Sequence, residues 1–300
     1  MSDAVSCNDC GFGIGRLEWG SMTARKRSRW GRLVELVDGH KRDAPPEKVP
    51  PRQVTSQTVV ENATVAADMV YGGGSYVLAD PLEEVTLIRS RFEMWQHPQQ
   101  RSLQERPTVR RLHVERCHVT ASDLGPLVIE DSTLDTVWIH RGKWGPQSIG
   151  GSVFKHVTVR GRITGSVSVL PYPHAYAFDP KDRTVRERFM EANARYYRSV
   201  DWALDISQAE FTSFDNEWAD VPARLYRRDP ETQVIVTRES CLGRDWRAAA
   251  EDSYLWVHLE RFLESGFADT VIVAPKRSKH FDAVMAAIGR LRDIGVVLPG

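Results

Sequence analysis

The amino-acid sequence predicts a mainly β protein with an α/β tail, in which a β-solenoid body, like a right-handed β-helix, is capped by C-terminal helices. Three observations lead to this fold class. Short runs of β-branched residues fill the middle of the chain, every second side chain in several runs is apolar, and the hairpin dipeptides Asn-Gly and Asp-Gly are absent between them. A β-sandwich would give similar alternation and remains the alternative fold.

Residues 1–43 are predicted to form a basic arm with one short helix, because Trp30, Leu33, Val34 and Val37 recur at helical spacing. Residues 44–54 follow as a proline-rich linker, with four prolines between positions 45 and 51. Such a run favours an extended polyproline spacer. The arm is therefore expected to be separable from the rest of the chain.

Residues 55–178 are predicted to form the solenoid-like body. The clearest strand runs are Val85–Ile88, Leu112–Val119, Leu127–Ile129, Val137–Ile139, Val153–Val159 and Ile163–Val169. Their irregular spacing matches no named repeat, but it is regular enough to suggest stacked coils of a parallel sheet.

Residues 179–250 are predicted to continue the body with a helix and a β-hairpin. The helix begins near Asp179, and its apolar stripe is Val185, Phe189, Ala192, Tyr196 and Val200. A turn at 229–232 is expected to join strands 223–227 and 233–237 as the hairpin.

Residues 251–300 are predicted to form a helix-strand-helix cap, with helices at 251–264 and 280–293 and a strand at 270–274. Gly266 and Gly295 stand where left-handed residues commonly end helices. A cap of this kind would cover the open end of a stack of strands.

The composition is that of an ordinary globular protein, at 41% hydrophobic and 27% charged residues with a formal net charge of zero. This balance argues against a disordered, collagen-like or coiled-coil chain, and no overall field would draw the molecule to nucleic acid or to an anionic membrane. The chain shows neither a secretion signal nor an apolar run of about 18 residues, so a cytoplasmic protein without a membrane partner is expected.

Six residues on the predicted strands are candidates for a partner-binding face, since stacked coils would place their side chains in a shared ladder. They are His113, Glu115, His118, Trp138, His140 and His156. The arm adds a second candidate surface, because Arg25, Arg27 and Arg29 lie close to Trp30. Arginines interleaved with aromatic residues suit either phosphates or an acidic protein.

Four carboxylates between aromatic residues are candidates for catalysis, should the chain be an enzyme. These are Asp205, Glu210, Asp215 and Glu217. Cleavage of a glycosidic bond needs two carboxylates and a surface for sugar rings, so this stretch suggests a glycan as substrate.

Two further motifs point to small ligands. Lys276, Arg277 and Lys279 follow a predicted strand and precede a helix, an arrangement that suits a phosphate or carboxylate. Cys7 and Cys10 have the spacing of half a zinc site, but the second Cys-x-x-Cys pair is missing, so other ligands would have to come from His40, Cys117 or Cys241. No other cofactor is expected.

No motif names a reaction, and the sequence leaves open whether the protein is an enzyme. The extended faces and the tethered arm favour a non-enzymatic cytosolic binding protein with a protein partner, for which an immunity or antitoxin-like role is one concrete version. The alternatives are an enzyme acting on a glycan or phosphorylated ligand, and nucleic-acid binding through the arm.

Overall fold

The computed structural model describes residues 47–48, 59–61, 63–69, 82–84, 86–88, 91–96, 106, 108–121, 126–141, 148–172, 183–216 and 219–298. All of them belong to the compact unit that spans residues 46–300. The predicted arm, with Arg25, Arg27, Arg29, Cys7 and Cys10, lies outside the described residues.

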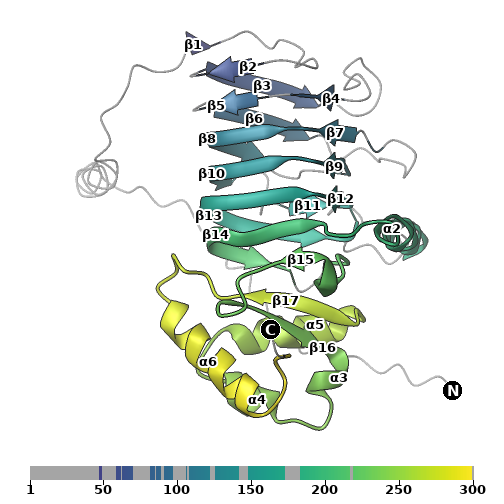
Figure 1. Ribbon diagram of the computed structural model, residues 1–300, viewed down its shortest axis with the longest axis vertical. Coiled ribbons are helices and arrows are strands. Elements are labelled where there is room, and N and C mark those ends of the chain that lie inside the picture. Colours follow the sequence, from purple (N-terminus) through teal and green to yellow (C-terminus); the bar gives the residue numbers. More distant parts are fainter. Residues whose placement is uncertain are drawn as a thin grey trace, which may run out of the picture. The chain divides into compact units, whose positions relative to one another are not determined.

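The described strands form two parallel sheets and one antiparallel pair (Figure 1). The larger parallel sheet contains β1 (Glu47–Lys48), β2 (Val59–Glu61), β3 (Ala63–Met69), β5 (Thr86–Ile88), β6 (Arg91–Gln96), β8 (His113–Ala121), β10 (Thr133–Arg141), β11 (Ser148–Gly150), β13 (Val157–Leu170), β14 (Leu204–Asp215) and β15 (Tyr226–Arg227). The smaller parallel sheet contains β4 (Leu82–Glu83), β7 (Thr108–Arg110), β9 (Val128–Glu130) and β12 (Val153–Lys155).

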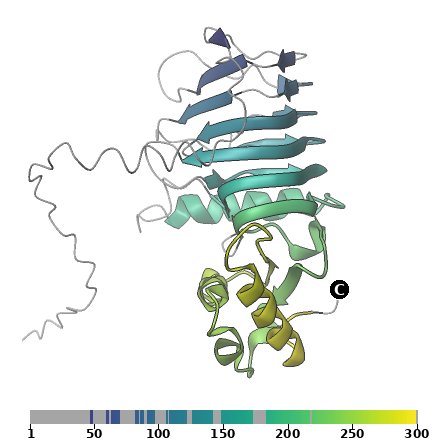
Figure 2. The same ribbon diagram turned by 90° about the vertical axis from the view of Figure 1, so that its left-hand side faces the viewer.

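The chain alternates between these two sheets as it advances. β7, β9 and β12 of the smaller sheet lead directly into β8, β10 and β13 of the larger one, and each strand pairs with its counterpart one passage later. We call one such passage a rung. Figure 2 shows the rungs one above another. The predicted mainly β fold is confirmed, whereas the antiparallel layers of the sandwich alternative do not occur in the two larger sheets of the described chain.

A column of left-handed residues makes the corner between the two sheets. Glu84, Arg111, Asp131 and His156 have φ values of 58°, 52°, 49° and 55°. The amide of each donates a hydrogen bond to the next rung, as when Arg111 N binds the Glu130 carbonyl at 3.1 Å and Asp131 N binds that of Lys155 at 2.9 Å. A left-handed conformation costs such residues about 1–2 kcal/mol. The bond kept at each corner offsets much of this cost, at a net value of about 1 kcal/mol.

This corner corrects one predicted strand. The run Val153–Val159 is not continuous, because His156 turns the chain from β12 into β13. Ser132 and Ser152, buried just after a corner and just before β12, complete the turns: their hydroxyl oxygens accept hydrogen bonds from Leu112 N and Leu127 N at 3.1 and 3.0 Å. Corner and ladder thus form one continuous hydrogen-bonded structure.

A second column of left-handed residues bends three neighbouring strands of the larger sheet, β8, β10 and β13. Arg116 and Thr136 adopt φ values of 51° and 54°, and Gly161 follows at 68°. The register between β10 and β13 shifts at this place, between Asp135 and Val137. We call these positions the bend; they divide the outer surface of the sheet into two faces.

Apolar side chains fill the interior in register. Cys117, Val137, Ile163 and Phe211 are paired neighbours on β8, β10, β13 and β14, and each is at most 4% exposed. Burial of such a column stabilises the stack by about 25 cal/mol per Å² of apolar surface. The predicted alternation of these strands is therefore the alternation between interior and solvent.

Helix α2 (Arg183–Tyr197) covers the smaller sheet (Figure 1). Of the predicted apolar stripe, Phe189 and, just after the helix, Val200 are buried, and Tyr196 packs against the core. The helix also buries Asn193 and Tyr197, which the stripe did not include. Tyr196 donates a hydrogen bond to Glu130 at 2.9 Å. Tyr197 accepts one from Phe154 N at 3.3 Å, which ties the helix to β12.

A C-terminal module, residues 233–298, closes the far end of the stack. It contains β16 (Gln233–Thr237), α3 (Arg238–Cys241), α4 (Trp246–Ala250), α5 (Leu255–Ser265), β17 (Asp269–Val273) and α6 (Phe281–Asp293), and a 3-10 helix (Ala223–Leu225) precedes it. The module has its own apolar core. Gly266 and Gly295 are left-handed where the helices end, as predicted.

The predicted hairpin across residues 229–232 is wrong. The chain does turn there, with Gln233 N bound to the Asp229 carbonyl at 2.8 Å, but β16 pairs antiparallel with β17 and β15 pairs parallel with β14. Gln233 is buried and donates through Nε2 to the Ile206 carbonyl at 2.8 Å, which joins the module to the stack. Within the described residues, no helix is long and apolar enough to cross a membrane.

Substitution of Gly161 by alanine is expected to destabilise the protein by about 2 kcal/mol, within the range for overpacked positions. At φ +68°, its Cβ would lie 2.4 Å from Thr136 Oγ1 and 2.8 Å from Asp135 Oδ1. Urea unfolding measures the loss. Gly289→Ala is the matched control, because the added methyl group meets open space on α6. Replacement of a glycine inside a helix by alanine is expected to raise the free energy of unfolding by about 0.5–1 kcal/mol. Equal stability of Gly161→Ala and the wild type would contradict the bend geometry.

Candidate functional site

The bend separates the predicted partner-binding residues into two faces. His113 and Glu115 lie before the bend on β8, with His113 Nε2 3.5 Å from Glu115 Oε2. Asp135 and Arg160 continue this first face and form an ion pair at 2.8 Å. Charged side chains on this face therefore largely neutralise one another.

The second face, beyond the bend, carries aromatic and uncharged side chains on the neighbouring strands β8, β10 and β13. His118 and Trp138 are paired neighbours whose rings stack, with centroids 4.9 Å apart and planes 16° apart. Their chain neighbours Cys117 and Val137 point inward, so these two rings point outward. We call the outward positions His118, Trp138, Thr164 and Thr212 the uncharged strip. Charged residues flank it, because Arg91 of β6 pairs with His118 and Asp215 of β14 pairs with Ser168 farther along β13. His140 pairs with Thr120 on the same strands, but its side chain lies outside the described residues.

His156 does not belong to either face, because it occupies the corner. Its Nδ1 lies 3.0 Å from Asp131 Oδ1 and its Nε2 lies 2.6 Å from Asp201 Oδ1. Its ring stacks on Trp202 at 4.8 Å, and the guanidinium of Arg227 covers the same indole at 4.1 Å. We call these five residues the corner cluster. The single ladder expected from the sequence is thus divided among two faces and a corner.

The corner cluster favours the protonated imidazole. The hydrogen bond that His156 donates to Asp201 is the largest cause that raises the pKa of His156, and the bond to Asp131 adds to it. The same bond lowers the pKa of Asp201. A neutral imidazole has one N–H and can donate to one carboxylate only, whereas the imidazolium donates to both.

The candidate catalytic carboxylates are spread along β14 and have separate neighbours. Asp205 accepts hydrogen bonds from Ser207, Glu210 pairs with Arg277 at 2.9 Å, and Asp215 accepts from Ser213 at 3.3 Å. Asp205 and Asp215 are ten residues apart, or up to about 33 Å along an extended strand, whereas glycosidase carboxylates lie within about 5–10 Å. Glu217 lies outside the described residues.

The loop proposed for anions already holds carboxylates. Lys276 pairs with Asp229 at 3.1 Å, and Arg277 pairs with Glu210. Lys279 is exposed beside them. Two of the three predicted cations therefore serve contacts that fasten the module to the stack.

Two of the possible further zinc ligands, Cys117 and Cys241, are buried thiols outside any disulfide. In the part of the chain that the structure describes, no three His, Cys, Asp or Glu side chains are grouped as metal ligands.

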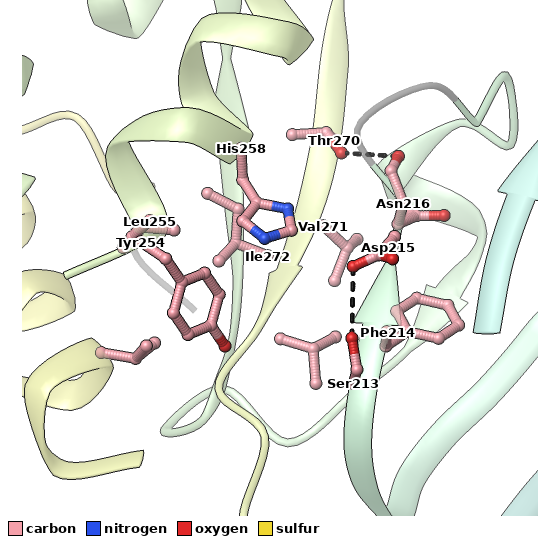
Figure 3. A pocket seen from close by; sticks show the side chains of 12 residues that line it. Ser213, Phe214, Asp215, Asn216, Tyr254, Leu255, His258, Thr270, Val271 and Ile272 are labelled. Carbon is pink, nitrogen blue, oxygen red and sulfur yellow. Dashed lines mark hydrogen bonds between the residues drawn. The ribbon is translucent and has the colours of Figure 1, made fainter. Parts of the chain in front are cut away.

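A small niche lies where the end of β14 meets the module (Figure 3). Ser213 and Asp215 line it from β14, opposite Tyr254 and His258 of the α5 region. Tyr254 and His258 are in edge contact, with ring centroids 5.2 Å apart. Burial, and to a lesser extent Asp215, raises the pKa of Tyr254 to about 12. The niche thus brings one predicted carboxylate next to an imidazole and a phenol.

A buried polar cluster lies beneath α2. Asn193 accepts a hydrogen bond from Arg106 at 2.5 Å and donates to Asp220 at 2.7 Å. Burial raises the pKa of Asp220 to about 7 and lowers that of Arg106 to about 10. The cluster thus joins Arg106 and Asp220 to α2 through Asn193.

Comparisons of the chain with protein-family models, curated proteins and solved structures found no match. The sequence interpretation missed Asp131, Asp201, Trp202 and Arg227 of the corner cluster, as well as Tyr254 and His258 of the niche. The sequence does contain one signal of the corner. A polar or charged residue, such as Asp131 or His156, stands just before the apolar alternation of the next strand begins.

The corner cluster is expected to make stability depend on pH. Because the folded state raises the pKa of His156, its contribution is complete below the unfolded value near 6.5 and is lost as pH rises through the folded pKa. The difference in melting temperature between the wild type and His156→Gln should shrink as pH rises. His113→Gln serves as the control, and an equal difference at every pH would refute the assignment.

Proposed function

We propose that the chain is a non-enzymatic, cytosolic binding protein that uses the uncharged strip to hold a protein partner. The observation that carries this proposal is the stacked pair His118 and Trp138 in a strip whose other members, Thr164 and Thr212, bear no charge. Protein interfaces are depleted of charge and enriched in aromatic residues at their centres. His140 would extend the same surface.

The neighbouring first face fits this role less well. Asp135 is held by Arg160 at 2.8 Å, and Glu115 lies 3.5 Å from His113. A partner would have to break or desolvate the ion pair of Asp135 and Arg160 on docking. The charged side chains of the corner cluster likewise contact one another or Trp202, so the binding energy is expected to come from the strip.

We infer that the stack of rungs is a β-solenoid, with the right-handed winding that parallel crossovers favour. The alternation of β7, β9 and β12 with β8, β10 and β13 supports this inference, as do the two columns of corners. A solenoid supplies a flat, rigid row of side chains, and preorganised side chains lose little entropy on binding.

An immunity or antitoxin-like role, in which the strip occludes an enzyme's surface, is one form of this proposal. The cytosolic location is part of it and agrees with Cys117 and Cys241, which are thiols outside any disulfide. Nucleic-acid binding through Arg25, Arg27 and Arg29 is the competing form; it predicts affinity that falls steeply with salt and disappears when residues 1–43 are deleted.

Capture of proteins from the native host tests the strip. The Trp138→Ala variant is expected to lose at least about 2 kcal/mol of binding, a fall of roughly thirtyfold in affinity, because truncation of a central interface aromatic commonly costs this much. The exposed Arg195 of α2 provides the control Arg195→Ala, which should bind as the wild type does. Recovery of no stoichiometric partner, or equal recovery by both variants, would reject the proposal.

An enzyme centred on the niche is the second candidate, because Asp215, Ser213, Tyr254 and His258 meet there. A carboxylate and an imidazole can act as general base and general acid in a reaction on a glycan or phosphorylated ligand.

Assay of a panel of polysaccharides and phosphate esters tests this candidate. If the niche is catalytic, Asp215→Asn should lower turnover at least about a hundredfold. Asp205→Asn is the control, since that carboxylate lies at the other end of β14. Absence of any turnover by the wild type would remove the enzyme interpretation.

A further inference from the structure

Two arginines border the uncharged strip at the bend. Arg116 stands at the left-handed position of β8 with its side chain 61% exposed, and Arg162 follows Gly161 on β13 and is also exposed. Both therefore lie between the first face and the strip. Arginine and large aromatic residues are enriched among the interface residues that contribute most to binding.

The positive charge of Arg162 is not neutralised by any residue that the structure describes. Its neighbour across the sheet is Glu210, whose carboxylate is held by Arg277 at 2.9 Å. Arg160, two positions earlier, differs because Asp135 neutralises it. The border of the strip thus has an excess of positive charge that the first face lacks.

Arg116 can also change partners. Its Nε lies 3.6 Å from Glu115 Oε1, a long contact between partly exposed groups, and Glu115 is shared with His113. Ion pairs in such settings contribute little to stability, so the guanidinium can turn to an incoming carboxylate at low cost.

We propose that the partner held by the strip is a protein whose contact surface is acidic, with Asp or Glu side chains that face Arg116 and Arg162 and an apolar group that packs on Trp138. This inference rests on the proposed function of the strip. A protein is favoured over a nucleic acid because affinity for nucleic acid comes from many phosphate contacts. The cations with described side chains at the border of the strip are Arg116 and Arg162, and Arg91, which pairs with His118, would add one more.

Zero-length carbodiimide crosslinking tests the proposal directly. The Arg162→Lys variant of the full chain keeps the charge and adds an amine that carbodiimide joins to a carboxylate in contact. The variant is incubated with nuclease-treated native-host lysate and crosslinked, and the joined peptides are identified by mass spectrometry. A crosslink between position 162 and an Asp or Glu of the protein retained through Trp138 is the expected result.

Arg188→Lys is the matched control, because Arg188 is exposed on α2, away from the strip, and should give no such crosslink. With the retained protein purified, Arg162→Glu should slow association about tenfold at low salt, and the effect should fade as salt screens the charges.

The outcomes separate this inference from the proposed function. Trp138-dependent capture without a crosslink at position 162, or with salt-independent association, would overturn the acidic partner and leave the strip as a binding surface. Capture that nuclease treatment abolishes would also overturn it, in favour of a nucleic acid. Loss of all Trp138-dependent capture would overturn both.

Discussion

The parallel hydrogen-bond ladder, carried without a break around each corner, is the constraint on which the structure depends. The amides of Arg111, Asp131 and His156 donate to the next rung even though their backbone is left-handed. Continuity at the corner fixes the register of the strands on either side of it. This register stacks Cys117, Val137 and Ile163 inside and His118 on Trp138 outside.

Alternation and helix-ending glycines made much of this fold predictable. The apolar positions of β8, β10 and β13 indicated strands, and Gly266 and Gly295 marked the ends of two helices. Pairings and contacts between segments that are distant in the sequence were not predictable. A turn at 229–232 is compatible with a hairpin, but β16 gains a better partner in β17, which lies beyond three helices and shares its core. Asn193 is buried because Arg106 and Asp220, both distant in sequence, satisfy its amide.

Only some residues of the candidate site could be identified from the sequence, and their grouping could not. Outward-pointing positions follow from the period of a strand, so His118 and Trp138 were found. The bend could not be anticipated, because Arg116 and Thr136 are not residues that normally signal a left-handed backbone. Without it, His113 and His118 were placed on one face. The contacts of His156 come from 25 residues before it and 45 after it, separations that only the stacking of rungs brings together.

The two ends of the stack differ in a way that matters for mechanics. Each rung contacts little beyond the rungs above and below it, so a pulling force applied at the first strands would detach the strands one after another. At the opposite end, Gln233, Asp269 and Arg277 fasten β14 and its neighbours to a module with its own core. Force from that side must shear several contacts at once. The molecule is therefore compliant at one end and stiff at the other.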